Sequence, residues 1–417
     1  MIDKLTICFN PWMVYSKNDN YDVIIGEIAE RGFNCIRIDD GAGLLWDGDG
    51  NVRNNFLISV PFGSYTEHTT YKVIVDKEEL NILDRLLRIC FAAKKHNIKV
   101  ILSSWFLLHT NWFCQECDVN HIFNMPPEQK ITYFAEELKR ILDTLKSENL
   151  IDVVAFAEIL NEFDNIPWYR NHTSLTAEEA TGLRIVHERE IDKLKKNHPD
   201  ILFAYDAKNV QPMKEIIPRN IDVFNFHHYY AWNLYDAFEN GLCFDVLTLD
   251  EPEIPDKTRY FLKNDILSVK DVADTMNSDI KTGPDWPRRI SLYASIDYEK
   301  EPELNQLLEK SLKENMDFYR SKFLSGVDTA IAIHDSVVPN SKIVMGEGVT
   351  YCASPALTFE KDSKHFWELI MEQMIYFNKR GLWGSIVATT HAPDRSTAWE
   401  PCKDLYIQAN RCFTDGK

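Results

Sequence analysis

Short apolar runs alternate along the chain with longer segments whose apolar residues recur every three or four positions. This alternation is typical of βα units that repeat around a parallel sheet. The apolar runs predict eight strands, at about 5–9, 33–38, 100–104, 153–160, 201–205, 223–229, 342–346 and 384–388. Amphipathic helices are expected between them, as in 21–31, where Gly32 follows as a C-terminal cap. The pattern predicts an α/β fold, one (β/α)8 (TIM) barrel over residues 1–417, with its active site at the carboxyl ends of the strands.

Two connections are longer than a minimal barrel needs. Roughly 35 residues follow strand two before its helix, and roughly 70 separate strand six from a helix that begins near Pro302. Both extensions follow a strand, so we expect them on the active-site face. No internal repeat or linker indicates a second domain, and the segment 233–301 is therefore interpreted as an insertion into the barrel.

The charge of the chain restricts its partners. Its 46 basic and 64 acidic residues give a net charge of -18, which argues against a nucleic-acid ligand. We find no signal-peptide pattern and no apolar run long enough to span a membrane. The nine cysteines show no spacing that suggests disulfide pairs, which is typical of a protein from a reducing compartment. These features predict a cytoplasmic protein without membrane contact, unless the chain is a trimmed form of a secreted one.

Two strand ends carry candidate chemistry. The segment 157–165 runs from apolar residues into a cluster of amides and carboxylates that includes Glu162, and a second apolar strand ends at Glu347 between two glycines. Each pattern alone is equally compatible with an ordinary turn. Together they favour glycoside hydrolysis with retention, which needs a carboxylic acid and a nucleophilic carboxylate about 5 to 5.5 Å apart.

The segments 158–162 and 346–347 resemble the ends of strands four and seven in the cellulase-like enzymes of glycoside hydrolase family 5 and in the wider clan A of retaining (β/α)8 glycosidases. The resemblance implies that Glu162 is the general acid/base and Glu347 the nucleophile. It also implies that Asn161 binds the 2-hydroxyl of the sugar.

Further segments extend the resemblance. The segment 32–37 is similar to the family's strand two, which implies that Arg37 steadies the nucleophile, although an ordinary structural arginine is the alternative. Glu158 is expected on the same face of its strand as Glu162 and is a candidate partner for Arg37. The clan carries a His-x-Tyr on strand six, which implies roles for His227 and Tyr229. A shift of one residue in register would select His228 and Tyr230 instead.

Some positions depart from the family pattern. Phe163 follows the Asn-Glu pair where proline is frequent, Trp105 stands where a strand-three histidine is usual, and the platform tryptophan expected near Ala388 is absent. Four tryptophans could provide a flat face for a sugar, or could simply be packed in the core: Trp12, Trp105, Trp232 and Trp399.

The sequence therefore predicts a retaining β-glycosidase for β-linked oligosaccharides of gluco- or manno-configuration, without cofactor or metal. The insertion and the expected location favour an exo-acting enzyme. The alternatives are an endo-acting polysaccharide hydrolase, a catalytically silent carbohydrate-binding barrel and a metal-dependent barrel enzyme. The last is disfavoured because the sequence shows no set of histidine and aspartate ligands on several strand ends. The segment 47–51 and the Cys114-x-x-Cys117 pair lack the further ligands of a metal site, and an enzyme that uses two carboxylates needs no metal at the His227-His228 pair.

Overall fold

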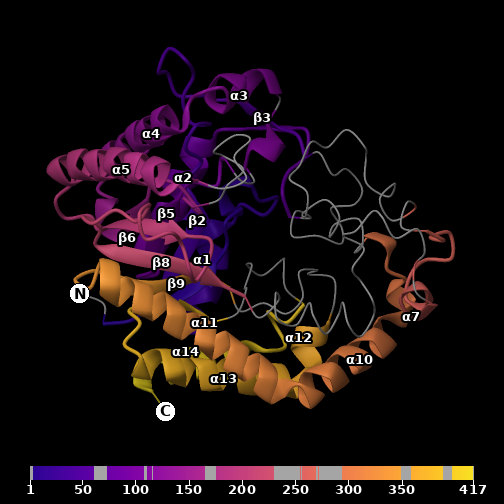
Figure 1. Ribbon diagram of the computed structural model, residues 1–417. Helices are drawn as coiled ribbons and strands as arrows, with labels where there is room; N and C mark the ends of the chain where they lie inside the picture. Colours follow the sequence, from indigo (N-terminus) through magenta and orange to yellow (C-terminus); the bar gives the residue numbers. More distant parts are fainter. Residues whose placement is uncertain are drawn as a thin grey trace.

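Eight parallel strands close into a barrel in the computed structural model (Figure 1). The model describes residues 3–60, 73–107, 110–114, 116–164, 175–229, 254, 256–268, 271, 294–348, 358–387 and 397–416. The strands follow each other around the barrel in chain order, and the last pairs with the first. They are β1 (Leu5–Phe9), β2 (Cys35–Asp39), β5 (Lys99–Ser103), β6 (Val154–Glu158), β7 (Phe203–Ala207), β8 (Val223–His228), β9 (Lys342–Gly348) and β10 (Gly384–Ile386). The predicted (β/α)8 barrel is confirmed.

The helices pack their apolar stripes against the outside of the barrel. They are α1 (Tyr21–Glu30), α2 (Ile82–Lys95), α4 (Pro127–Ser147), α5 (Ala177–Asn197), α11 (Met316–Val337), α13 (Lys364–Lys379) and α14 (Lys403–Asp415). Local signals fix several helix starts: α4 has a proline in its first turn, and at α5 Thr176 and Glu179 form a reciprocal capping box. Between β7 and β8 the chain passes through turns instead of a helix.

The insertions lie where the sequence predicted them. After β2 the chain forms an antiparallel pair, β3 (Phe56–Ile58) and β4 (Glu78–Leu80), and α3 (Glu116–Phe123) follows β5. After β8, the described parts of the insertion include α7 (Asp256–Tyr260), and α10 (Glu301–Glu314) follows the insertion; both helices lie beyond the carboxyl ends of the strands (Figure 1). The short helix α12 (Phe359–Asp362) packs on α10. Most of 233–301, like Trp232, lies outside the described residues, and its membership in a single domain stays a prediction.

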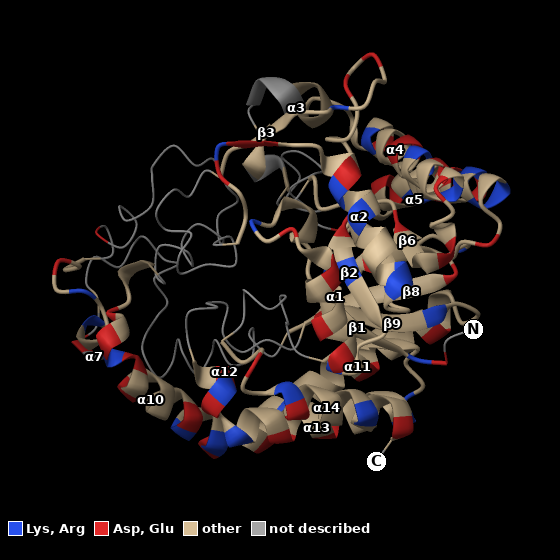
Figure 2. Cartoon of the chain, turned by 180° about the vertical axis from the view of Figure 1, so that it is seen from behind, with Lys and Arg blue, Asp and Glu red and all other residues tan. Residues whose placement is uncertain are grey.

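The surface carries charges of both signs. Acidic and basic residues alternate along α4, α5, α10 and α13 (Figure 2). Mixed surface charge of this kind keeps a strongly acidic chain in solution without a single-sign field. Among the described residues, no helix combines the length and the apolar character needed to cross a bilayer.

The barrel interior changes from apolar to polar along the strands. Near the amino ends of the strands it is filled by a separate apolar cluster that includes Ile101, Phe156 and Ala204. The next inward position is two residues further along each strand. On five strands this position holds a fully buried polar residue: Arg37, Ser103, Glu158, Asp206 and Asn225. The polar layer therefore rests on a packed apolar floor.

A β-bulge in β9 aims Glu347 into the barrel. The inward residue before it is Val344, so strict alternation would point Gly346 inward and Glu347 outward. The pairing of β9 with β8 shifts here, from Phe226 opposite Met345 to His227 opposite Glu347, and Gly346 is the extra residue. A Cβ on Gly346 would lie only 2.4 Å from Oδ1 of Asn225.

We expect Gly348→Ala to destabilise the protein by more than ~2 kcal/mol. Gly348 has φ +147°, and a Cβ there would lie 1.9 Å from the backbone oxygen of His228, which cannot move aside. The matched control is Gly182→Ala in the middle of α5, where a Cβ would meet nothing within 4 Å. That variant should gain up to ~1 kcal/mol from helix propensity. Urea unfolding of both variants measures the difference, and equal midpoints would contradict this account of Gly348.

A buried histidine makes stability sensitive to acid. His187 stacks on Phe163 with ring centroids 4.3 Å apart, and neither of its nitrogens has a hydrogen-bond partner among the described residues. Burial lowers the pKa of His187 from 6.5 to about 3. Between these values the unfolded chain binds a proton that the folded chain does not. Stability should therefore fall by about 1.4 kcal/mol per pH unit of acidification within this window.

We predict that His187→Leu loses less stability than the wild type between pH 6.5 and pH 4. The apolar side chain keeps the packing and removes the titrating group. Denaturant unfolding at several pH values measures the slope, with exposed His121→Gln as the control that should follow the wild type. An unchanged slope in His187→Leu would show that this histidine does not contribute to acid sensitivity.

Candidate active site

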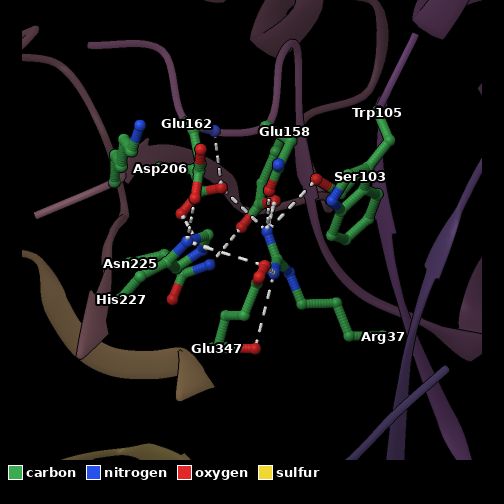
Figure 3. A network of polar contacts seen from close by, with 12 residues as sticks. Arg37, Ser103, Trp105, Glu158, Glu162, Asp206, Asn225, His227 and Glu347 are labelled. Carbon is green, nitrogen blue, oxygen red and sulfur yellow. Dashed lines mark hydrogen bonds and ion pairs between the residues drawn. The ribbon is translucent and has the colours of Figure 1, made fainter. Parts of the chain in front are cut away.

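The guanidinium of Arg37 is the centre of the polar layer (Figure 3). Its side chain is fully buried, and the ring of Trp105 covers it, 4.4 Å from the guanidinium carbon to the ring centroid. Its acceptors come from four other strands and are Ser103 Oγ (3.3 Å), Glu158 Oε2 (2.8 Å), Asn161 Oδ1 (2.8 Å), Asp206 Oδ2 (2.8 Å) and Glu347 Oε2 (3.1 Å). Asn225 Nδ2 also donates to Glu158 Oε1 at 2.6 Å. Residues at the ends of four other strands thus bind one cation.

Glu162 lies just beyond β6 in an unusual backbone conformation. Its φ is +48°, in the left-handed region that non-glycine residues seldom adopt. Its backbone N–H donates to Oδ2 of Asp206 at 3.0 Å, which holds this conformation. The side chain then reaches the same space as Glu347: one carboxyl oxygen of each and Nδ1 of His227 lie within 4.8 Å of one another.

The two glutamates are the part of this cluster that solvent can reach. Their side chains are each 12% exposed, whereas those of Arg37, Glu158 and Asp206 are fully buried. A ligand at the carboxyl ends of the strands would therefore contact Glu162 and Glu347 before the supporting charges beneath them.

His227 lies between the two glutamates. Its Nδ1 is 3.0 Å from Glu162 Oε1 and 3.5 Å from Glu347 Oε2, and its Nε2 is 2.9 Å from Asp206 Oδ1. The hydroxyl of Tyr229 donates to Oε1 of Glu347. His228 instead points out of the barrel, where its ring stacks on Phe323 of α11. The structure therefore has the register that brings His227 and Tyr229 to the cluster.

Burial and charge act in opposite directions on these groups. Burial raises the pKa of Glu347, although His227 and Arg37 oppose the shift. The sequence predicted that Arg37 favours the ionised form of Glu347; that effect is present, but burial and Glu162 outweigh it. Burial alone would lower the pKa of His227, yet Asp206 and Glu347 raise it well above its ordinary value.

The charge on His227 bears on metal binding. Two carboxylates and an imidazole this close are also donor types of metal sites. An imidazolium, however, carries protons on both nitrogens and has no lone pair for a metal. Because Asp206 and Glu347 favour the protonated ring, the arrangement fits a hydrogen-bonded charge cluster better than a metal centre.

The tryptophans proposed as sugar platforms are buried in packing. Trp399 is fully buried against Arg31, 4.2 Å from ring centroid to guanidinium, and its indole N–H donates to Glu27. Trp12 packs edge-on against Trp105 and Phe113. Trp105 is 1% exposed. Of the two alternatives that the sequence left open for these three rings, a sugar platform or core packing, their burial favours core packing.

Sequence reasoning missed Asp206 and Ser103, and did not assign Asn225 to the site. Asp206 follows the apolar run that was taken to end at Tyr205. A signal was present, since Asp206 is two residues beyond inward-facing Ala204 and so continues the inward face of its strand.

Comparisons with known proteins identify the family and support the fold. A family model described as "Cellulase-like: Sugar-binding cellulase-like" matches residues 12–265, more than half of the chain. A candidate glycoside hydrolase from Parabacteroides distasonis superposes with a TM-score of 0.64 at 16% identity, covering 99% of this chain and 94% of its own. A broad-specificity endoglucanase from Clostridium longisporum gives 0.49 at 12% identity, with 98% and 96% covered. A sequence search among curated proteins found no match. The match to the family model shows that the chain belongs to the sugar-binding, cellulase-like family of (β/α)8 barrels.

Proposed function

We propose that the protein is a retaining β-glycoside hydrolase, with Glu162 as general acid/base and Glu347 as nucleophile. One observation carries the proposal: these two partly exposed carboxyl groups, from the ends of β6 and β9, approach within 4.8 Å. Retaining glycosidases need a separation of about 5 to 5.5 Å, whereas inverting enzymes need about 6.5 to 9.5 Å to admit a water molecule. The family and the barrel of a glycoside hydrolase support the same reaction class.

The partners of the two glutamates suit different roles. Glu347 contacts two groups that stabilise a carboxylate, the guanidinium of Arg37 and the hydroxyl of Tyr229, and would attack the anomeric carbon. Glu162 would donate a proton to the departing oxygen and then activate water to hydrolyse the glycosyl-enzyme. His227 reaches both carboxyls and would limit their mutual repulsion.

Asn161 is placed to recognise the sugar. Its Oδ1 accepts from Arg37 at 2.8 Å, which fixes the orientation of the amide. Its buried Nδ2 has no hydrogen-bond partner among the described residues. A buried donor without a partner is costly, and a sugar hydroxyl at the reacting ring would satisfy it. This supports the assignment of Asn161 to the 2-hydroxyl.

We propose β-linked gluco- or manno-configured oligosaccharides as substrates, cleaved from one end. The cellulase-like family supports a β-linked substrate. The described part of the insertion after β8, which includes α7, lies beyond the carboxyl ends of the strands, where it would restrict access to the mouth of the barrel. The test is a panel of aryl β-glucosides, β-mannosides and β-galactosides with short oligosaccharides. Proton NMR of the first-formed anomer should show a β-product. An α-product would refute retention, binding without turnover would favour a silent barrel, and loss of turnover in a chelator would favour a metal enzyme.

We predict that variants of the two glutamates depend differently on the leaving group. Glu347→Gln should lose at least ~1000-fold in kcat on every substrate, because no nucleophile remains. Glu162→Gln should lose ~100- to 10,000-fold on substrates with poor leaving groups, but far less on a 2,4-dinitrophenyl glycoside that departs without a proton.

The matched control is Asp164→Asn. Asp164 accepts a hydrogen bond from the backbone N–H of Lys208 and contacts neither glutamate in any described hydrogen bond, so turnover should persist. Circular dichroism checks that each variant is folded. An equal loss with both leaving groups in Glu162→Gln would refute its role as the acid.

A further inference from the structure

We infer that Asp206 is a positioning residue that holds His227 as a cation between the two glutamates, and thereby sets the acid side of the pH range in which Glu347 can react. The inference rests on the proposed function for its effect on turnover. The charge state of His227 can be measured without any substrate.

Asp206 occupies the one position that links the three relevant groups. It lies on β7 between β6, which carries Glu162 at its end, and β8, which carries His227. Oδ2 accepts from Arg37 and from the backbone N–H of Glu162, at 2.8 and 3.0 Å. Oδ1 lies 2.9 Å from Nε2 of His227. The carboxylate has no exposed surface, so solvent does not screen these interactions.

The surroundings of His227 favour its protonated form. The groups that face it are Asp206 from β7, Glu162 from the end of β6 and Glu347 from β9, with the cation Arg37 of β2 beyond them. Burial opposes a charge on the ring, but the three acidic neighbours outweigh it and raise the pKa of His227 well above 6.5. The effect is reciprocal, because His227 and Arg37 hold the pKa of Asp206 low against its own burial.

Of the fully buried carboxylates in the part of the chain that the structure describes, Asp206 is the one that contacts His227. Glu162 and Glu347 face the substrate side and would change charge or form a bond during the reaction. Glu158 is equally buried and binds the same nitrogen of Arg37 at the same distance, but it makes no described contact with His227. Asp206 is therefore the permanent counter-ion of the imidazolium, and the imidazolium in turn lowers the pKa of Glu347.

The experiment compares Asp206→Asn with Glu158→Gln. Both amides keep the size and the acceptor oxygen of the original side chain, and both remove one anion from Arg37. Only the first removes the counter-ion of His227. Selective 15N-histidine labelling, with His227→Gln to assign the signal, gives the titration of His227 directly.

His227 should stay protonated well above pH 6.5, the ordinary pKa of a histidine, in the wild type and in Glu158→Gln. In Asp206→Asn the same histidine should titrate ~1 to 3 pH units lower, which is the range expected when an adjacent opposite charge is lost. A histidine that is neutral at pH 7 in the wild type, or that titrates alike in wild type and Asp206→Asn, would overturn the inference.

The pH profile of kcat/KM on an aryl glycoside gives the consequence for turnover. Both variants release Arg37 from one anion, but only Asp206→Asn also disfavours the imidazolium that stabilises ionised Glu347, so its acid limb should lie ~1 pH unit above that of Glu158→Gln. In Glu158→Gln the limb should stay in place or move down, since Arg37 is then freer to stabilise Glu347. Equal limbs in the two variants would refute the role of Asp206 in turnover. If no glycoside is turned over by the wild type, the proposed function fails, while the NMR titration still decides the charge of His227.

Discussion

A guanidinium without exposed surface is the constraint on which the site depends. Burying an ion costs several kcal/mol unless charged and polar partners surround it. Arg37 meets this requirement with oxygens from β5, β6, β7 and β9, and with the face of Trp105. Because each partner is anchored to a different strand, satisfying one cation fixes the relative positions of strand ends around the barrel. The two glutamates are thus oriented before any ligand arrives.

The same layer holds more negative than positive groups. Glu158, Glu162, Asp206 and Glu347 face Arg37 and His227 within one network (Figure 3). Four carboxyls cannot all be ionised beside two cations without strong repulsion. A proton is therefore retained within this network, where burial raises the pKa values of Glu158 and Glu347. A pair of glutamates that shares such a proton has the charge state that acid-assisted nucleophilic attack requires, with one member neutral and the other ionised.

The regular parts of this arrangement could be predicted from sequence, and the irregular parts could not. Apolar runs and amphipathic stripes located the eight strands, and alternation along β8 correctly grouped His227 with Tyr229. Alternation alone would have pointed Glu347 outward, because the bulge at Gly346 depends on the pairing between strands. Asp206 was missed because its role arises from neighbours on β2 and β8. The sequence could not decide between a sugar platform and core packing for the tryptophans, because their burial depends on contacts with distant segments.

The irregular features are all unfavourable by themselves. Glu162 has a left-handed backbone, β9 contains a bulge, and several charges are buried in the barrel. Left-handed backbone alone costs on the order of 1 kcal/mol or more at a non-glycine residue. They lie together at the carboxyl ends of the strands, whereas the amino ends hold a continuous apolar cluster. This division explains how the barrel tolerates the irregular features. Apolar packing fixes the strands at their amino ends, so the carboxyl ends can hold strained backbone and buried charges that would be unstable in an isolated segment. The chemistry is consequently concentrated in the layer where the strands leave the apolar floor.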